Sequence, residues 1–156
     1  MIYKKGNLLD ILSPNNAIMH GCNMQGVWGS GVAKQMREKY PDAFVKYKDD
    51  LAFGNPYKFV LGDISVFKYA DGCTILSAFT QENYGRDGTR YVSYDALDEV
   101  FHNALKWSRD TTKTVNIPDL IGAGLGGGDY DTIVSIIKSN ECKWNAEIVC
   151  WQFNKP

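Results

Sequence analysis

His20 and Asn23 carry the side chains best suited to chemistry on a small ligand. They stand close together, and His20 lies within the apolar run 16–22, whose composition indicates a strand. An imidazole titrates near neutral pH, so His20 could donate a proton to a leaving oxygen or hydrogen-bond a phosphate. Each residue also has an ordinary structural interpretation. A histidine in a strand can make its hydrogen bonds to backbone groups, and an asparagine at a turn can hydrogen-bond to the backbone of its own segment.

Two glycine-rich segments each separate an expected strand from an expected helix. They read NMQGVWGSG at 23–31 and IGAGLGGGD at 121–129. Glycines let backbone N–H groups turn toward one point, and the N-terminus of the following helix adds roughly half a positive charge there. Two such loops at the carboxyl ends of neighbouring strands could hold a diphosphate between them without an excess of Lys or Arg.

Known phosphate-binding motifs do not explain these loops. Neither segment matches the P-loop pattern GxxxxGK[ST]. Residues 122–127 match GxGxxG literally, but no second half of a dinucleotide-binding fold follows them in the sequence. We therefore reject a Rossmann interpretation. One glycine-rich turn is often only a turn, so the expectation of phosphate binding rests on the pair.

Further candidates flank the two loops. Asp129 and Asp131 follow the second loop and could orient or activate a water, although an acidic residue at a helix start is a routine cap. Trp28 lies inside the first loop, where core packing alone explains a large aromatic poorly. The polar loop 81–90 contains Arg86, which could meet a terminal phosphate, with a solvated charge as the simpler interpretation.

The elements that must position these residues alternate between strands and helices. Helices are expected at 31–40, 42–53, 93–109 and 130–139, and strands at 2–5, 16–22, 58–69, 73–80, 114–120 and 146–153. The clearest helix is 93–109, where apolar residues recur at helical spacing. His102 on that helix has polar neighbours and is expected at the surface. The alternation predicts an α/β sandwich with helices on both faces of a mixed sheet.

Composition narrows the functional classes. A chain of 156 residues is expected to form one domain, 1–156, and a net charge of -1 argues against a duplex nucleic-acid partner. No apolar run approaches the roughly 20 residues of a membrane span, and the N-terminal segment lacks a signal-peptide pattern. Four cysteines without a CxxC pair predict reduced thiols in a cytoplasmic protein, with no metal site and no cofactor.

Taken together, these motifs resemble the macro domain family, whose members bind ADP-ribose. The segment from His20 to Ala33 is similar to the family's first loop, and Ile117 to Gly128 is similar to its second. The pattern H-x-C-N-x-x-G-x-W-G-x-G-[IV]-A, running on to Tyr40-Pro41, is nearest to the yeast ADP-ribose-1''-phosphate phosphatase group. Phe79-Thr80 followed by Tyr84-Gly85 adds to this likeness.

The resemblance implies a three-layer α/β/α fold and removal of the terminal phosphate from ADP-ribose 1''-phosphate. Because no metal-ligand cluster is visible in the sequence, this reaction is expected to need no metal. Two alternatives stay open: an ADP-ribose reader without turnover, and a hydrolase acting on ADP-ribosylated protein. A related glycohydrolase uses a lysine and an aspartate where this chain has Gln81 and Gly126, which disfavours that chemistry here. Asn7 replaces the acidic residue that usually accepts a bond from adenine, and a neutral acceptor should bind more weakly.

The resemblance also implies a set of site residues. His20 and Asn23 would act at the distal ribose, and Asp129 or Asp131 would orient or activate a water. Phe153 or Trp151, on one face of the last strand, could stack on adenine or pack in the core. The expected ligand-binding residues are Asn7, Leu8, Gly21, Cys22, Trp28, Gly29, Ser30, Gly31, Val32, Phe79, Ile121, Gly122, Ala123, Gly124, Leu125, Gly126, Gly127 and Trp151.

Overall fold

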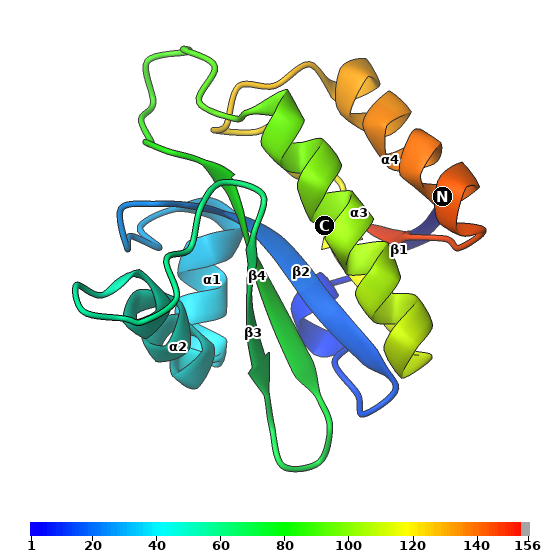
Figure 1. The fold of residues 1–156 in the computed structure, drawn as a ribbon. Coiled ribbons are helices and arrows are strands. Elements are labelled where there is room, and N and C mark those ends of the chain that lie inside the picture. The colour runs from blue at the N-terminus through cyan, green and yellow to red at the C-terminus, as the bar shows by residue number, and fades with distance from the viewer. Residues whose placement is uncertain (154–156) are drawn as a thin grey trace.

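A six-stranded mixed sheet forms the centre of the computed structural model, which describes residues 1–153 (Figure 1). The strands are β1 (Ile2–Lys5), β2 (Asn16–Asn23), β3 (Ile64–Lys68), β4 (Thr74–Gln81), β5 (Thr114–Pro118) and β6 (Val149–Gln152). They lie in the order β1-β6-β5-β2-β4-β3, and β3 alone runs antiparallel to its neighbour. The carboxyl ends of β5, β2 and β4 therefore meet side by side at one edge of the sheet.

Helices cover both faces of this sheet. The α-helices are α1 (Gly31–Lys39), α2 (Pro41–Leu51), α3 (Tyr94–Thr111) and α4 (Tyr130–Trp144), with a short 3₁₀ turn, η1, at Leu8–Asp10. Met19 of β2 packs in the cluster beneath α3 and α4, while its neighbour Ile18 packs in the opposite cluster with α1, α2 and η1. This alternation buries β2 on both faces. The predicted three-layer α/β/α sandwich is confirmed, with the layers visible in Figure 1.

Local chemistry explains where the helices start. The side chains of Ser93 and Asp129 accept hydrogen bonds from the backbone N–H groups of Ala96 and Thr132 and so cap α3 and α4. Pro41 occupies the first turn of α2, where its missing N–H costs nothing. Ser30 stands at the N-cap of α1 but makes no such side-chain bond, so the first N–H groups of α1 remain uncapped by it.

Four sequence-based expectations need correction. The strand predicted at 58–69 shortens to β3, because Gly62 (φ +95°) turns the chain and Asp63 bonds back to Val60. The strand predicted at 146–153 shortens to β6. His102, expected at the surface, is half-buried, and its Nδ1 accepts a hydrogen bond from Trp144 Nε1 at 3.2 Å between α3 and α4. Helix α4, predicted at 130–139, instead runs to Trp144.

Candidate functional site

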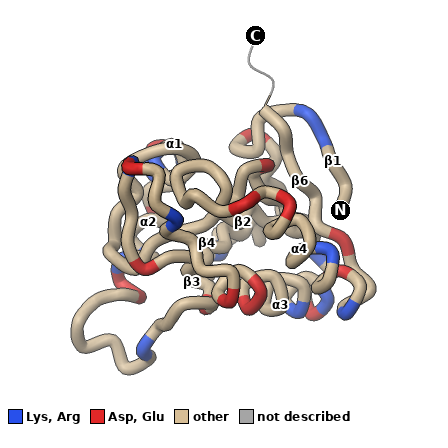
Figure 2. The backbone as a smooth tube through the Cα atoms, turned by 90° about the horizontal axis from the view of Figure 1, so that it is seen from above, with Lys and Arg blue, Asp and Glu red and all other residues tan. Residues whose placement is uncertain are grey.

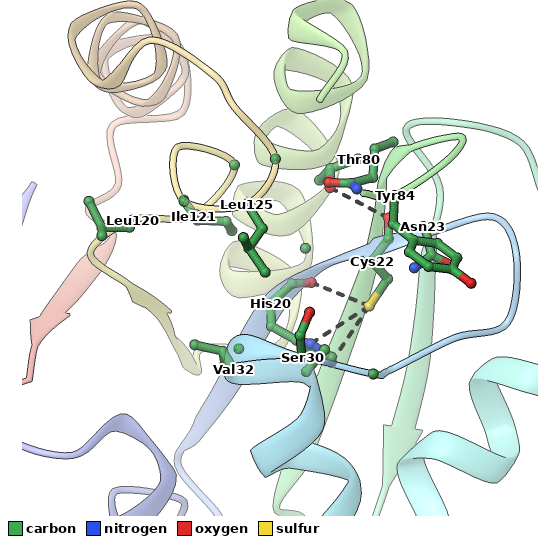
Figure 3. Close-up of a pocket in the computed structure, with 18 of the residues that line it drawn as sticks. His20, Cys22, Asn23, Ser30, Val32, Thr80, Tyr84, Leu120, Ile121 and Leu125 are labelled. Carbon is green, nitrogen blue, oxygen red and sulfur yellow. Dashed lines mark hydrogen bonds between the residues drawn. The ribbon is translucent and has the colours of Figure 1, made fainter. Parts of the chain in front are cut away.

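A cavity of about 640 Å³ opens at the edge where the carboxyl ends of β2, β4 and β5 meet (Figure 3). Three loops follow these strands and form its walls: loop 1 (24–30) after β2, the β4 loop (82–92) after β4, and loop 2 (119–129) after β5. A crevice at this edge of an open α/β sheet is the usual place for a ligand. The cavity lies where the two glycine-rich loops predict a ligand, with the β4 loop as a third wall, and binding there stays a prediction.

The lining combines predicted and unpredicted residues. Those predicted to belong to the site are His20, Gly21, Cys22, Asn23, Gly29, Ser30, Gly31, Val32, Ile121, Gly122, Gly124, Leu125 and Gly126. Those absent from the predicted set are Val27, Ala33, Thr80, Gln81, Tyr84, Gly85, Arg86, Pro118 and Leu120. The unpredicted group comes largely from the end of β4 and its loop, which no local sequence motif connects to β2.

Loop 1 delivers an uncapped helix N-terminus to the cavity. Gly31 adopts φ +61°, a left-handed conformation that favours glycine, and an added Cβ there would meet no other atom within 4 Å. Because the Ser30 side chain does not cap α1, the N–H groups at its start face a cavity rather than a protein acceptor. Such a terminus attracts an anion through its N–H groups and its dipole.

Loop 2 presents backbone donors from the opposite wall. Its own turns use the N–H groups of Ala123 and Gly124, which both donate to the Leu120 carbonyl, and of Gly127 and Gly128. The N–H groups of Leu125 and Gly126 have no backbone acceptor within residues 1–153. Both residues line the cavity, so these donors remain for a ligand.

Asn23 lines the cavity but its amide is already engaged in shaping loop 1. Its Nδ2 donates to the Val27 carbonyl at 2.8 Å, and its Oδ1 accepts from Gln25 N at 2.9 Å and from the Tyr47 hydroxyl at 3.0 Å. The turn-forming interpretation is therefore observed. A bond from this amide to a ribose stays a prediction.

His20 lies at the floor of the cavity in a dry environment. Its side chain is almost fully buried, its Nε2 lies 3.1 Å from Ser77 Oγ, and the edge of Trp28 packs against it with ring centroids 4.5 Å apart. Burial lowers the pKa of His20 to about 3. The imidazole is therefore neutral near pH 7, which does not fit the predicted donation of a proton from a charged ring.

Cys22 is buried beside His20, with Sγ 3.7 Å from both ring nitrogens (Figure 3). Burial raises the pKa of its thiol far above the ordinary value. The thiol therefore stays protonated and is no nucleophile. Cys22 therefore shapes the floor of the cavity and is not a reactive group there.

Two aromatic residues assigned to the ligand belong to the core instead. Trp28 is fully buried and packs on Phe44 and Tyr47 of α2 at centroid distances of 5.1 Å. Phe79 is likewise fully buried, 5.7 Å from Tyr47. The expectation that Trp28 contacts the ligand is contradicted, because its side chain is fully buried against aromatic partners from α2 that the local sequence did not reveal.

The predicted adenine-side residues also lie outside the cavity lining. Asn7 caps η1 by accepting from Leu9 N at 3.0 Å, and Leu8 is buried in the core. Trp151 donates from Nε1 to Asn116 at 2.8 Å and packs over Gly6. Phe153, the other stacking candidate, is exposed. In loop 2, Ala123 and Gly127 do not reach the lining either.

Asp129 and Asp131 do not line the cavity. The Asp129 carboxylate caps α4 through Thr132, whose N–H and hydroxyl donate to it at 2.9 and 2.7 Å, and these bonds lower its pKa. Asp131 is exposed in the first turn of α4. The capping interpretation is the observed one. Over residues 1–153, no cluster of three or more His, Cys, Asp and Glu residues could hold a metal ion.

The two ends of the cavity differ in chemistry. At one end lie Val32 and Leu120, with Ala33 and Pro118 beside them, an apolar lining suited to a base. At the other lie Asn23, Thr80 and Tyr84, with amide and hydroxyl groups suited to a sugar or phosphate (Figure 3). Ser30 of loop 1 and Leu125 of loop 2 lie between these ends (Figure 3), and together the three regions match an elongated nucleotide-like ligand.

Known proteins share this sequence over nearly its whole length. An ADP-ribose 1''-phosphate phosphatase from Scheffersomyces stipitis is 43% identical, with 94% of this chain and 98% of that protein covered. No family model matches the sequence. The chain belongs to the macro domain family. An uncharacterized 17.5 kDa protein of Enterobacteria phage T4 is 29% identical, with 96% of each chain covered.

Solved structures agree with this assignment. A macrodomain protein from Streptomyces coelicolor superposes with a TM-score of 0.79 over 98% of this macro domain and 99% of that chain. The two sequences are only 16% identical. The likeness therefore lies in the fold, and the function has to be argued from the cavity itself.

Proposed function

We propose that this macro domain binds ADP-ribose and hydrolyses the terminal phosphate of ADP-ribose 1''-phosphate. One observation carries the proposal: the cavity lies between two sets of backbone N–H groups, at the start of α1 and in loop 2, that have room for a diphosphate. The near-full-length likeness to a yeast-type phosphatase supports the choice of substrate. Together they favour the phosphatase over other uses of the fold.

The ligand would lie along the cavity in one direction. Adenine would occupy the apolar end at Val32 and Leu120, and the diphosphate would lie between Ser30 and Gly126. The distal ribose and its phosphate would then reach Asn23 and Thr80 at the polar end. This order comes from matching apolar surface to the base and donors to the charged groups.

The reaction needs little acid–base help from the protein. A water oxygen bonds to phosphorus while the bond from phosphorus to the ribose oxygen breaks, and a proton from the water ends on that oxygen. The products are ADP-ribose and inorganic phosphate. Transfer of a phosphoryl group depends mainly on positioning and charge stabilisation, so a cavity that holds the diphosphate and thereby positions the terminal phosphate fits it even though His20 stays neutral.

Two other functions would use the same cavity. A reader would bind ADP-ribose without turnover and needs no further groups. A hydrolase of ADP-ribosylated protein has less support, because Gln81 and Gly126 stand where the related glycohydrolase has its lysine and aspartate. These two positions do face one another: a Cβ added to Gly126 would lie 3.2 Å from Gln81 Oε1. An amide and a glycine supply neither a nucleophile nor a carboxylate there.

Release of inorganic phosphate from ADP-ribose 1''-phosphate tests the proposal. The pure protein should release it with multiple turnovers, and a mono-ADP-ribosylated protein offered in parallel should stay modified. Calorimetry with ADP-ribose should give a complex at micromolar affinity. Binding without release would establish a reader, and removal of ADP-ribose from the protein would establish the third function.

A further inference from the structure

Arg86 is the one charged side chain on the cavity wall among residues 1–153. His20 also lines the cavity but is neutral, and the remaining lining residues are uncharged. Arg86 belongs to the β4 loop, on the side of the cavity formed by Thr80, Gln81 and Tyr84. A full positive charge therefore stands at the polar end of a cavity whose other donors are dipoles.

The backbone around Arg86 is held in place on both sides. Before it, Gly85 lies against the Tyr91 ring so closely that an added Cβ would clash with the Tyr91 hydroxyl. After it, Asp87 accepts from that hydroxyl at 2.8 Å and from Thr89 N at 3.0 Å. These contacts hold the backbone on both sides of Arg86 in a defined conformation.

The β4 loop is also tied directly to loop 2. The N–H groups of Tyr91 and Val92 both donate to the Gly126 carbonyl, at 2.8 and 3.0 Å. Gly126 lines the cavity between its two ends. The loop that carries Arg86 is thus tied at its end to the loop that lines the proposed diphosphate site, and the exposed Arg86 side chain starts from this braced backbone.

No carboxylate neutralises Arg86 within the described residues. The ion pairs of residues 1–153 join Glu141, Asp10 and Asp50 to other cations. The nearest acidic residue in sequence, Asp87, is turned toward Tyr91 and Thr89, and those hydrogen bonds lower its pKa. The guanidinium therefore remains available to an anionic group of a ligand.

We propose that Arg86 binds the terminal phosphate and makes this macro domain prefer ADP-ribose 1''-phosphate over ADP-ribose; this inference rests on the proposed function. A guanidinium presents paired N–H donors that match two phosphate oxygens, and such charge-assisted bonds are about twice as strong as neutral ones. It also stabilises the charge on the phosphoryl oxygens as the bond to the ribose oxygen breaks. Backbone donors hold the diphosphate, and Arg86 recognises the terminal phosphate on the distal ribose.

Three variants separate this role from a general electrostatic effect. Arg86→Gln removes the charge, Arg86→Lys keeps the charge without the paired donors, and Arg90→Gln is the matched control. Arg90 lies in the same loop, but its guanidinium stacks on the Tyr94 ring at 4.4 Å and it does not line the cavity. Phosphate release gives kcat/KM for ADP-ribose 1''-phosphate, and inhibition of that release by ADP-ribose gives the affinity for the product.

Arg86→Gln should lower kcat/KM about 100-fold, the effect typical of losing one donor to a developing charge, and should change the ADP-ribose affinity less than about 3-fold. Arg86→Lys should fall between Arg86→Gln and the unchanged protein, and Arg90→Gln should match the unchanged protein. Equal losses in turnover and in ADP-ribose affinity would overturn the proposal, because Arg86 would then serve the diphosphate. No effect on either would show a solvated charge and would overturn it as well.

Failure of the proposed function would give a different pattern. If the unchanged protein releases no phosphate, ADP-ribose 1''-phosphate becomes a stable ligand whose affinity calorimetry can measure directly. The inference then requires that this ligand binds at least about 10-fold tighter than ADP-ribose, and that Arg86→Gln removes the difference. Equal affinities in the unchanged protein would overturn the inference even if ADP-ribose itself binds.

Discussion

His20 shows how burial changes the chemistry available to one residue. An exposed imidazole would be partly charged near pH 6.5, whereas the ring between Ser77, Cys22 and Trp28 stays neutral because burial penalises the charged form. We infer that His20 contributes to the site through packing and through one neutral hydrogen bond. Its effect should appear in stability before it appears in turnover.

The free energy of unfolding should fall as pH drops from about 6.5 to about 3. In this window the unfolded chain binds a proton at His20 that the folded protein, with a pKa of about 3, does not bind. The loss is roughly 1.4 kcal/mol per pH unit at most, or about 4 kcal/mol over the window. Urea unfolding at a series of pH values measures it.

Carboxylates also lower stability in acid, so a variant must isolate the histidine. His20→Gln removes the titrating group and should flatten the pH dependence by about 4 kcal/mol over the same window. Where that variant does not fold, the ring nitrogens of the unchanged protein can be followed by NMR. An imidazolium signal already present at about pH 6 would contradict the buried, neutral ring.

At the scale of elements, glycines of loop 2 have two different roles. Gly124 does not adopt the positive φ that favours glycine, and an added Cβ would have its nearest neighbour, the Leu120 carbonyl oxygen, at 4.0 Å. Gly127 has φ +72°, and an added Cβ would lie 2.7 Å from the Thr89 carbonyl oxygen. Gly124 therefore keeps space open in the cavity, whereas Gly127 is required by the fold.

Gly124→Val should weaken ADP-ribose binding more than about 10-fold while leaving the midpoint of thermal unfolding nearly unchanged, since the side chain fills cavity space. Gly127→Ala should instead lower stability by about 1–3 kcal/mol through backbone strain. Calorimetry and thermal unfolding on both variants make the comparison. If Gly124→Val bound ADP-ribose normally, loop 2 would not touch the ligand. Gly126 is a poorer test, because its added Cβ would clash with the Gly122 carbonyl.

How far the sequence predicts the site depends on the range of the interactions. Loops 1 and 2 were predictable, because a glycine-rich segment between a strand and a helix is a local pattern. Arg86 could be named as a candidate for a phosphate from the sequence, but its place on one wall with Thr80 could not, because that depends on β4 lying beside β2 in the sheet. Only the structure gives that strand order.

The wrong expectation for Trp28 also arises from a contact between residues far apart in the sequence. Trp28 stands in a loop in sequence, and its partners Phe44 and Tyr47 come from a separate helix that folds back onto it. A pattern of residue types within loop 1 contains no information about α2. The hydroxyl of Tyr47 also donates to the Asn23 carbonyl at 2.6 Å, so the same helix shapes the turn.

At the scale of the whole molecule, charges of both signs are spread over the helices and loops, without a continuous basic strip along residues 1–153 (Figure 2). No helix in that part of the chain is long and apolar enough to cross a membrane. We therefore expect backbone N–H groups that contact the ligand to hold ADP-ribose, without help from a large surface of Lys and Arg side chains.

Raising the salt concentration should accordingly weaken ADP-ribose binding only slightly, since helix and backbone dipoles act at short range within a partly closed cavity. ADP-ribose 1''-phosphate should show the steeper dependence, because Arg86 meets its terminal phosphate. Calorimetry at low and high salt compares the two ligands. A steep fall for ADP-ribose itself would mean that side-chain cations hold the diphosphate.

Phosphorus NMR of ADP-ribose 1''-phosphate mixed with a small amount of the protein tests the central claim most directly, because it observes the terminal phosphate and the diphosphate in one sample. The terminal signal should disappear and inorganic phosphate should grow in equal measure, while the diphosphate signals persist as those of ADP-ribose; Gly124→Val should abolish the change. A terminal signal that stays intact, or diphosphate signals that disappear instead, would contradict the assignment of this macro domain as a phosphatase of ADP-ribose 1''-phosphate.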